Sequence, residues 1–164
     1  MGKDKKYWEY LERIQKEKAN HNYEKMLDYC EKSLPYIEQM VKSTIKEYGT
    51  MDIVSIPALE IGAKYWAVQK QTEKINNLES IINGIEEIRD DWIELLEIAK
   101  EEMDLAIRIE NYIKDNPGVL QNKLGKTLGV SGYETKSIVT VIENLKIVRK
   151  AKHNKTYELY IMPV

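Results

Sequence analysis

Histidine and cysteine, which often bind metal ions or act as nucleophiles, are few in this sequence, and those few are isolated. Each of the two histidines, His21 and His153, lacks a second histidine or cysteine at metal-ligand spacing. Cys30 is the single cysteine and lies on an apolar helical stripe, so we interpret it as a core thiol rather than a nucleophile or redox sensor. Carboxylates are mixed with lysines over the expected helix surfaces, which is typical of solvated faces.

Motifs that hold nucleotides or activate a serine are also missing from the sequence. It contains no phosphate-cradling glycine-rich loop, no dinucleotide-binding fingerprint and no G-x-S-x-G. We therefore expect that the protein is not an enzyme and that it holds no cofactor and no metal ion. The chemistry that remains is electrostatic binding by lysine and arginine.

Positive charge is concentrated in the last third of the chain. Residues 1–103 carry 15 Lys and Arg against 21 Asp and Glu, a net of −6, whereas residues 104–164 carry 10 against 6, a net of +4. The two values sum to the −2 of the whole chain. An acidic part joined to a basic part is typical of a nucleic-acid-binding module on a separate scaffold. The alternative is that surface lysines only keep a small domain soluble.

The basic region has a regular order of expected elements. The turn signal at residues 116–118 is followed by a helix with Val119, Leu120, Leu124 and Leu128 at helical spacing, which Gly129 is placed to end. Ser131 is a plausible cap for a second helix over about 133–146. The buried face of that helix is expected to be Ile138, Val141, Ile142 and Leu145. Two strands, 147–151 and 156–161, flank a polar turn at 152–155.

Helix, tight turn, helix and hairpin, over about residues 104–164, resembles the winged helix-turn-helix family of prokaryotic transcriptional regulators, broadly the MarR-like kind. Its most specific part is PGVLQNKLGKTLGVS, residues 117–131. Many members place small residues at the start of the second helix. Here that helix begins Gly132-Tyr133-Glu134, and the Glu134 carboxylate would be repelled by phosphate.

The resemblance implies that three segments contact double-stranded DNA. The first helix would touch phosphates, the second would lie in the major groove, and the hairpin or wing would flank the minor groove. From the first helix we expect contacts by Gln121, Asn122, Lys123 and Lys126. From the second we expect Tyr133, Lys136, Ser137 and Thr140, and from the wing Arg149, Lys150, Lys152, His153, Asn154 and Lys155.

Residues 1–103 are expected to form a separate domain of antiparallel helical hairpins or a bundle. Apolar stripes at helical spacing predict helices over 3–18, 23–34, 36–48, 57–71 and 72–82. The segment from Tyr23 resembles the second helix of a tetratricopeptide repeat. Pro35 either begins a new helix or kinks a long one. We interpret residues 51–56 as a loop, with Ser55 and Thr72 as caps of the helices that follow.

A helical pattern without Gly or Pro then continues from Ile85 to Ile113. It predicts one long connecting helix, or two with a kink near Glu101-Glu102. Long helices that flank winged modules often dimerise in that superfamily, so the resemblance implies a homodimer. The alternative is two consecutive helices within a compact bundle.

The expected fold is therefore mainly α: N-terminal helical hairpins, a long connecting helix and a C-terminal winged helix-turn-helix with a small β-hairpin. No apolar run is long enough to span a membrane, the first residues contain no apolar segment, so we expect no secretory signal, and a single cysteine fits a reducing cytoplasm. We expect a cytoplasmic, homodimeric, DNA-binding transcriptional regulator. The alternative is an adaptor that docks proteins through the winged domain and the N-terminal helical half.

Overall fold

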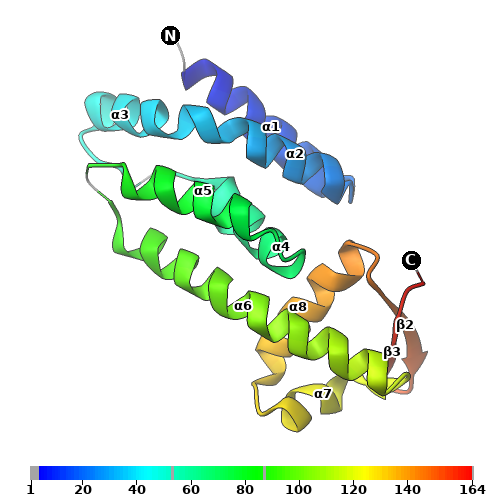
Figure 1. Ribbon diagram of the computed structural model, residues 1–164. Coiled ribbons are helices and arrows are strands. Elements are labelled where there is room, and N and C mark those ends of the chain that lie inside the picture. Colours follow the sequence, from blue (N-terminus) through cyan, green and yellow to red (C-terminus); the bar gives the residue numbers. More distant parts are fainter. Residues whose placement is uncertain (1–3, 53, 87, 164) are drawn as a thin grey trace. The chain divides into compact units, whose positions relative to one another are not determined.

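The computed structural model describes residues 4–52, 54–86 and 88–163. The chain is mainly helical, with a small antiparallel sheet near its C-terminal end (Figure 1). It divides into two compact units, residues 1–99 and 100–164. The division falls within one continuous helix, α6 (Asp90–Asp115), which supplies residues to both units. The boundary expected from the sequence, between residues 103 and 104, lies in the same helix.

Two helical hairpins in the N-terminal unit are closed by the same turn. One joins α1 (Asp4–Ala19) to α2 (Tyr23–Ser33), and the other joins α4 (Ala63–Val68) to α5 (Thr72–Asn83). In each turn the middle residue has a positive φ, 57° at His21 and 61° at Lys70. The residue after it donates its backbone N–H to the carbonyl five residues earlier, over 2.9 Å and 2.8 Å. Helical hairpins were expected here, although the cap of α5 is Gln71 rather than Thr72.

Pro35 lies in a single 3₁₀ turn, η1 (Leu34–Tyr36), that connects α2 to α3 (Ile37–Tyr48). Proline has no N–H to donate to the preceding turn, and a tighter local winding accommodates that loss. The structure lies between the two expectations for Pro35. The helix changes to 3₁₀ winding at this residue, and no loop separates α2 from α3. Gly49, with a φ of 73°, then ends α3.

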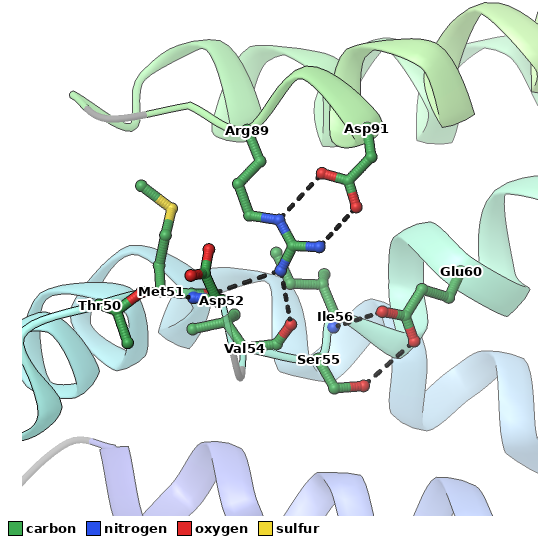
Figure 2. A network of polar contacts seen from close by, with 9 residues as sticks. All are labelled: Thr50, Met51, Asp52, Val54, Ser55, Ile56, Glu60, Arg89 and Asp91. Atoms are coloured by element: carbon green, nitrogen blue, oxygen red, sulfur yellow. Dashed lines mark hydrogen bonds and ion pairs between the residues drawn. The ribbon is translucent and has the colours of Figure 1, made fainter.

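A π-helical turn, η2 (Ala58–Gly62), opens the helix that continues as α4. A Cβ atom on Gly62 would lie 3.4 Å from the Cβ of Cys30 and from the Trp66 ring, so this glycine permits a close approach to α2. Ser55 is not the helix cap that we expected. Instead, the Glu60 carboxylate accepts hydrogen bonds from the Ser55 hydroxyl (3.1 Å) and the Ile56 N–H (3.4 Å), so the helix supplies its own cap (Figure 2).

The loop that precedes η2 is tied to the start of α6 by Arg89 (Figure 2). The guanidinium donates to the carbonyls of Met51 (3.2 Å) and Val54 (3.3 Å), and it forms a bidentate ion pair with the Asp91 carboxylate. Its planar group also lies 5.2 Å from the Trp92 ring. Arg89 thereby adds a charge-assisted hydrogen bond to each of these two loop carbonyls.

The core of the N-terminal unit is apolar with few polar insertions. Trp66, Ile14 and Met26 are fully buried, and so is Cys30, as expected for a core thiol. Burial raises the pKa of the Cys30 thiol to about 12. The Tyr7 hydroxyl, also buried, donates to the Ser55 carbonyl, and burial raises its pKa. No helix in the described ranges is long and apolar enough to cross a membrane.

The C-terminal unit contains the end of α6, α7 (Gln121–Leu128), α8 (Gly132–Asn144) and three strands. These are β1 (Val119–Leu120), β2 (Val148–His153) and β3 (Thr156–Ile161), in the antiparallel order β1-β3-β2. The bounds of β3 match those expected. Two expectations were wrong. Val119 and Leu120 pair with Leu159 and Glu158 instead of starting a helix, and β2 runs on to His153.

Two further details of the structure differ from the sequence-based expectation. The tip of the hairpin is only Asn154-Lys155, because Lys152 and His153 belong to β2 and pair with Tyr157 and Thr156. Asn154 has a φ of 54°, which lets so short a loop reverse the chain. The long helix is unbroken at Glu101-Glu102, but it begins at Asp90, so Ile85 precedes it.

Candidate nucleic-acid interface

The turn between α7 and α8 depends on Gly125. A Cβ atom at this position would lie 3.0 Å from the Thr135 hydroxyl oxygen, 3.0 Å from the Val130 carbonyl oxygen and 3.2 Å from that of Ser131. The Val130 N–H also donates to the Gly125 carbonyl, over 2.9 Å. Gly129, with a φ of 73°, ends α7 as expected. The second helix is therefore held directly against the first.

The first turn of α8 is closed by a reciprocal cap. The Ser131 hydroxyl oxygen accepts the Glu134 N–H (3.1 Å) and donates to the Glu134 carboxylate (3.2 Å). The cap at Ser131 was expected, whereas the role of Glu134 was missed. Its signal was the S-x-x-E spacing, in which the acidic residue also favours the positive end of the helix. The carboxylate is thus engaged within the helix end.

Helix α8 has one buried and one exposed side. Ile138, Val141 and Ile142 are buried as expected, and Val139 is buried as well, whereas Leu145 lies beyond the helix end and is only partly buried. Tyr133, Lys136 and Thr140 are exposed and Ser137 is half-buried. Tyr133 is 84% exposed, the highest value among the large hydrophobic side chains described. The Thr140 hydroxyl donates to the Lys136 carbonyl, which leaves its oxygen lone pairs for a ligand.

Helix α7 offers three of its four expected contacts to solvent. Asn122, Lys123 and Lys126 are exposed. Gln121 is half-buried, and its side-chain oxygen is buried with no hydrogen-bond partner among the described residues, so it does not face a ligand. The Asn122 N–H donates to the buried Thr156 hydroxyl, which anchors α7 to β3.

Some polar and basic residues of the hairpin are exposed, and others contact neighbouring side chains. Lys152, Asn154 and Lys155 are exposed. Lys150 is engaged, because its ammonium lies 3.7 Å from the Glu143 carboxylate and 5.1 Å from the Tyr157 ring, and its side chain is only 17% exposed. The Arg149 guanidinium stacks 4.1 Å from the Tyr160 ring, and His153 lies 3.6 Å from the Glu158 carboxylate.

Several residues that shape this unit were not singled out from the sequence. Tyr157, Glu158 and Tyr160 of β3 hold the basic residues of β2, and Thr135 closes the turn. Arg108 of α6 donates to the Leu128 carbonyl at the end of α7, over 2.6 Å. The alternation of residues along β3 could have indicated which side chains share a face with β2, but only once the register was known.

The arrangement places exposed ammonium groups on three elements of one compact unit: α7, α8 and the hairpin. Such groups bind phosphate by charge without a fixed geometry, whereas base edges are read by groups that project from a helix. Among the described residues, no three His, Cys, Asp or Glu side chains are placed to hold a metal ion. Comparison with known proteins adds no assignment, because the chain matches no protein-family model, no curated protein and no solved structure.

Proposed function

We propose that this protein is a transcriptional regulator that binds duplex DNA through its C-terminal unit, acting as a winged helix-turn-helix. The observation that carries the proposal is the exposed side of α8, held against α7 at Gly125 and flanked by free lysines on both neighbouring elements. A helix of this length and exposure fits the major groove of B-form DNA. The net charge of residues 104–164, +4, favours association with phosphate.

Thr140 and the exposed lysines of α7, α8 and the hairpin have proposed roles. Lys136 lies one turn from Thr140 on α8 and contacts a guanine edge or a phosphate, and Thr140 accepts a hydrogen bond from a base. Lys123 and Lys126 contact phosphates beside the groove. Lys152 and Lys155 contact phosphates of the DNA backbone that lies beside the hairpin. Lys150 and Gln121, which are engaged or buried, are left out of this set.

The acidic residue at the start of α8 is compatible with this docking. The Glu134 carboxylate is hydrogen-bonded to Ser131 at the positive end of the helix, so part of its charge is compensated locally. Replacing it with glutamine would keep the cap and remove the repulsion. The Glu134→Gln variant is therefore expected to bind duplex more tightly than the wild type.

The experiment is fluorescence anisotropy of a labelled AT-rich duplex, titrated with the full-length protein at several salt concentrations. If about four phosphates are contacted per unit, log K falls with log salt at a slope of about −3.6, doubled for a dimer.

The double variant Lys136→Glu/Lys152→Glu is expected to lose binding. The control, Lys16→Glu/Lys25→Glu, makes the same change in net charge on exposed residues of the N-terminal unit and is expected to bind with a smaller loss. Absence of salt-dependent binding to any duplex would overturn the proposal.

A second function, docking of protein partners, is favoured by aromatic side chains on the surface of the N-terminal unit. Trp8 and Tyr48 are 41% and 60% exposed. Aromatic residues are enriched at protein interfaces. If the protein is an adaptor that contacts its partner through the N-terminal unit, the Lys136→Glu/Lys152→Glu variant should bind that partner as well as the wild type does. A pull-down with both forms distinguishes it from the DNA-binding function.

A further inference from the structure

One face of the β2–β3 hairpin carries a linked set of side chains, Arg149, His153, Glu158 and Tyr160, which we call the hairpin cluster. Alternation along β2 places Arg149 and His153 on the same face. The register pairs Arg149 with Tyr160 and His153 with Thr156, so Glu158 lies diagonally across from His153. Diagonal neighbours on one face are within reach of long side chains.

Both carboxylate oxygens of Glu158 face a partner in this cluster. One lies 3.6 Å from Nδ1 of His153, and the other accepts a hydrogen bond from the Tyr160 hydroxyl over 3.2 Å. The Arg149 guanidinium covers the Tyr160 ring. The His153 side chain is 47% exposed, so its imidazole is open to solvent while it lies beside Glu158.

The other charged groups around the hairpin do not compete for His153. Lys150 and Lys152 alternate onto the opposite face of β2, where Lys150 is paired with Glu143 from α8. In α7, the Asn122 N–H donates to the Thr156 hydroxyl, and the next residue, Lys123, is exposed. Lys155 lies in the exposed tip. Among the described residues, the carboxylate within ion-pairing distance of His153 is that of Glu158.

We propose that His153 and Glu158 make the affinity of this hairpin for duplex DNA depend on pH, an inference that rests on the proposed DNA-binding function. When the imidazole is neutral, the charges of Arg149 and Glu158 cancel. When it is protonated, His153 forms an ion pair with Glu158 and the cluster has a net charge of +1. Imidazole side chains change charge between pH 5 and 8, and phosphate favours the charged form. DNA binding therefore takes up protons and strengthens as the pH falls from 8 to 6.

The test is anisotropy at pH 8, 7 and 6 with constant ionic strength. We expect log K to rise as the pH falls, by at most about one per pH unit for each C-terminal unit. The salt slope should be steeper at pH 6, by up to about 0.9. His153→Gln should remove most of this dependence. His21→Gln, which changes the only other histidine, should retain it. Glu158→Gln should bind more tightly than the wild type at pH 8, because it removes a negative charge from the hairpin.

Two failures are distinguishable. If the wild type binds duplex equally well at all three pH values, or if His153→Gln keeps the full pH dependence, the role of His153 and Glu158 is overturned while DNA binding stands. If no duplex is bound at any pH and low salt, both the proposed function and this inference are overturned.

Discussion

At the scale of single residues, Gly125 makes the sharpest demand on the C-terminal unit, because three oxygen atoms surround the place where a side chain would begin. Gly125→Ala is expected to destabilise the fold by about 1–3 kcal/mol, since two of the three oxygens belong to the backbone and cannot move aside freely. Urea unfolding followed by circular dichroism measures this change.

The matched control is Gly132→Ala, in the first turn of α8, where a Cβ atom would meet no described atom within 4 Å. Alanine there should be neutral or stabilise by up to about 1 kcal/mol, because it reduces the freedom of the unfolded chain. Equal unfolding midpoints for the two variants would contradict the crowding at Gly125.

Cys30 gives a second prediction at this scale. Its pKa of about 12 and its complete burial leave almost no thiolate at pH 8, and the thiolate is the reactive form. A chromogenic disulfide reagent should label the native protein far more slowly than the urea-unfolded protein. Rapid stoichiometric labelling of the native protein would show that the helix pair α1–α2 opens readily.

The exposure of single residues was largely predictable, but their partners were not. Helical periodicity places Lys136 and Thr140 outward and Ile138 and Ile142 inward, and the structure agrees. Periodicity cannot place Lys150 beside Glu143, because that contact depends on how β2 packs against α8. The engaged state of Lys150 was therefore missed.

At the scale of elements, the loop before η2 is held by Arg89, which donates to the Met51 and Val54 carbonyls and forms an ion pair with Asp91. The hydrogen bond from Arg89 lowers the pKa of Asp91 below its ordinary value of 3.8. A carboxyl with a depressed pKa in the folded state stabilises the fold above its ordinary pKa, and this contribution is lost as the pH falls through the folded value. Asp91→Asn should therefore lower Tm at pH 7 and have a smaller effect below pH 3.

The control for this pair is Asp90→Asn, which alters the neighbouring exposed carboxylate in the same helical turn. Differential scanning calorimetry across pH 2–7 compares both variants with the wild type. If the Tm difference between Asp91→Asn and the wild type were the same at both ends of this range, the ion pair would not be the source of the stability.

Elements with local signals were predictable, and elements that depend on distant partners were not. The strand β3 was predictable from the alternation of its residues. The end of α7 was predictable from Gly129, which readily adopts the positive φ of a helix C-terminus. Strand β1 has only two residues, and its apolar pair continues the spacing of Leu124. It becomes a strand because β3, nearly forty residues later, offers it hydrogen bonds. A period of 3.6 read along the sequence cannot contain that information.

At the scale of the whole molecule, the expected homodimer stays a prediction, and α6 suggests how to test it. Ile93 and Ile107 are 38% and 36% exposed and lie fourteen residues apart, which is close to four helical turns. They therefore share one side of α6. If this side pairs two copies, light scattering should give twice the chain mass of 19.2 kDa.

The double variant Ile93→Lys/Ile107→Lys should then weaken dimerisation at least about tenfold, because burying an unpaired charge is costly. Ile98→Lys is the control, since Ile98 has similar exposure but lies on a different side of the helix. A wild-type mass of 19.2 kDa at micromolar concentration would exclude a stable dimer.

The strand order has a consequence for how the protein is made. In the order β1-β3-β2, the strand synthesised last of the three lies in the middle, and both others are hydrogen-bonded to it. While the ribosome is still translating α8 and β2, neither β1 nor β2 has its partner, so the nascent unit consists of helices with two unpaired segments. A premature stop at the codon for Asn154 would thus remove the entire sheet, including the Val119–Leu120 strand that had already emerged.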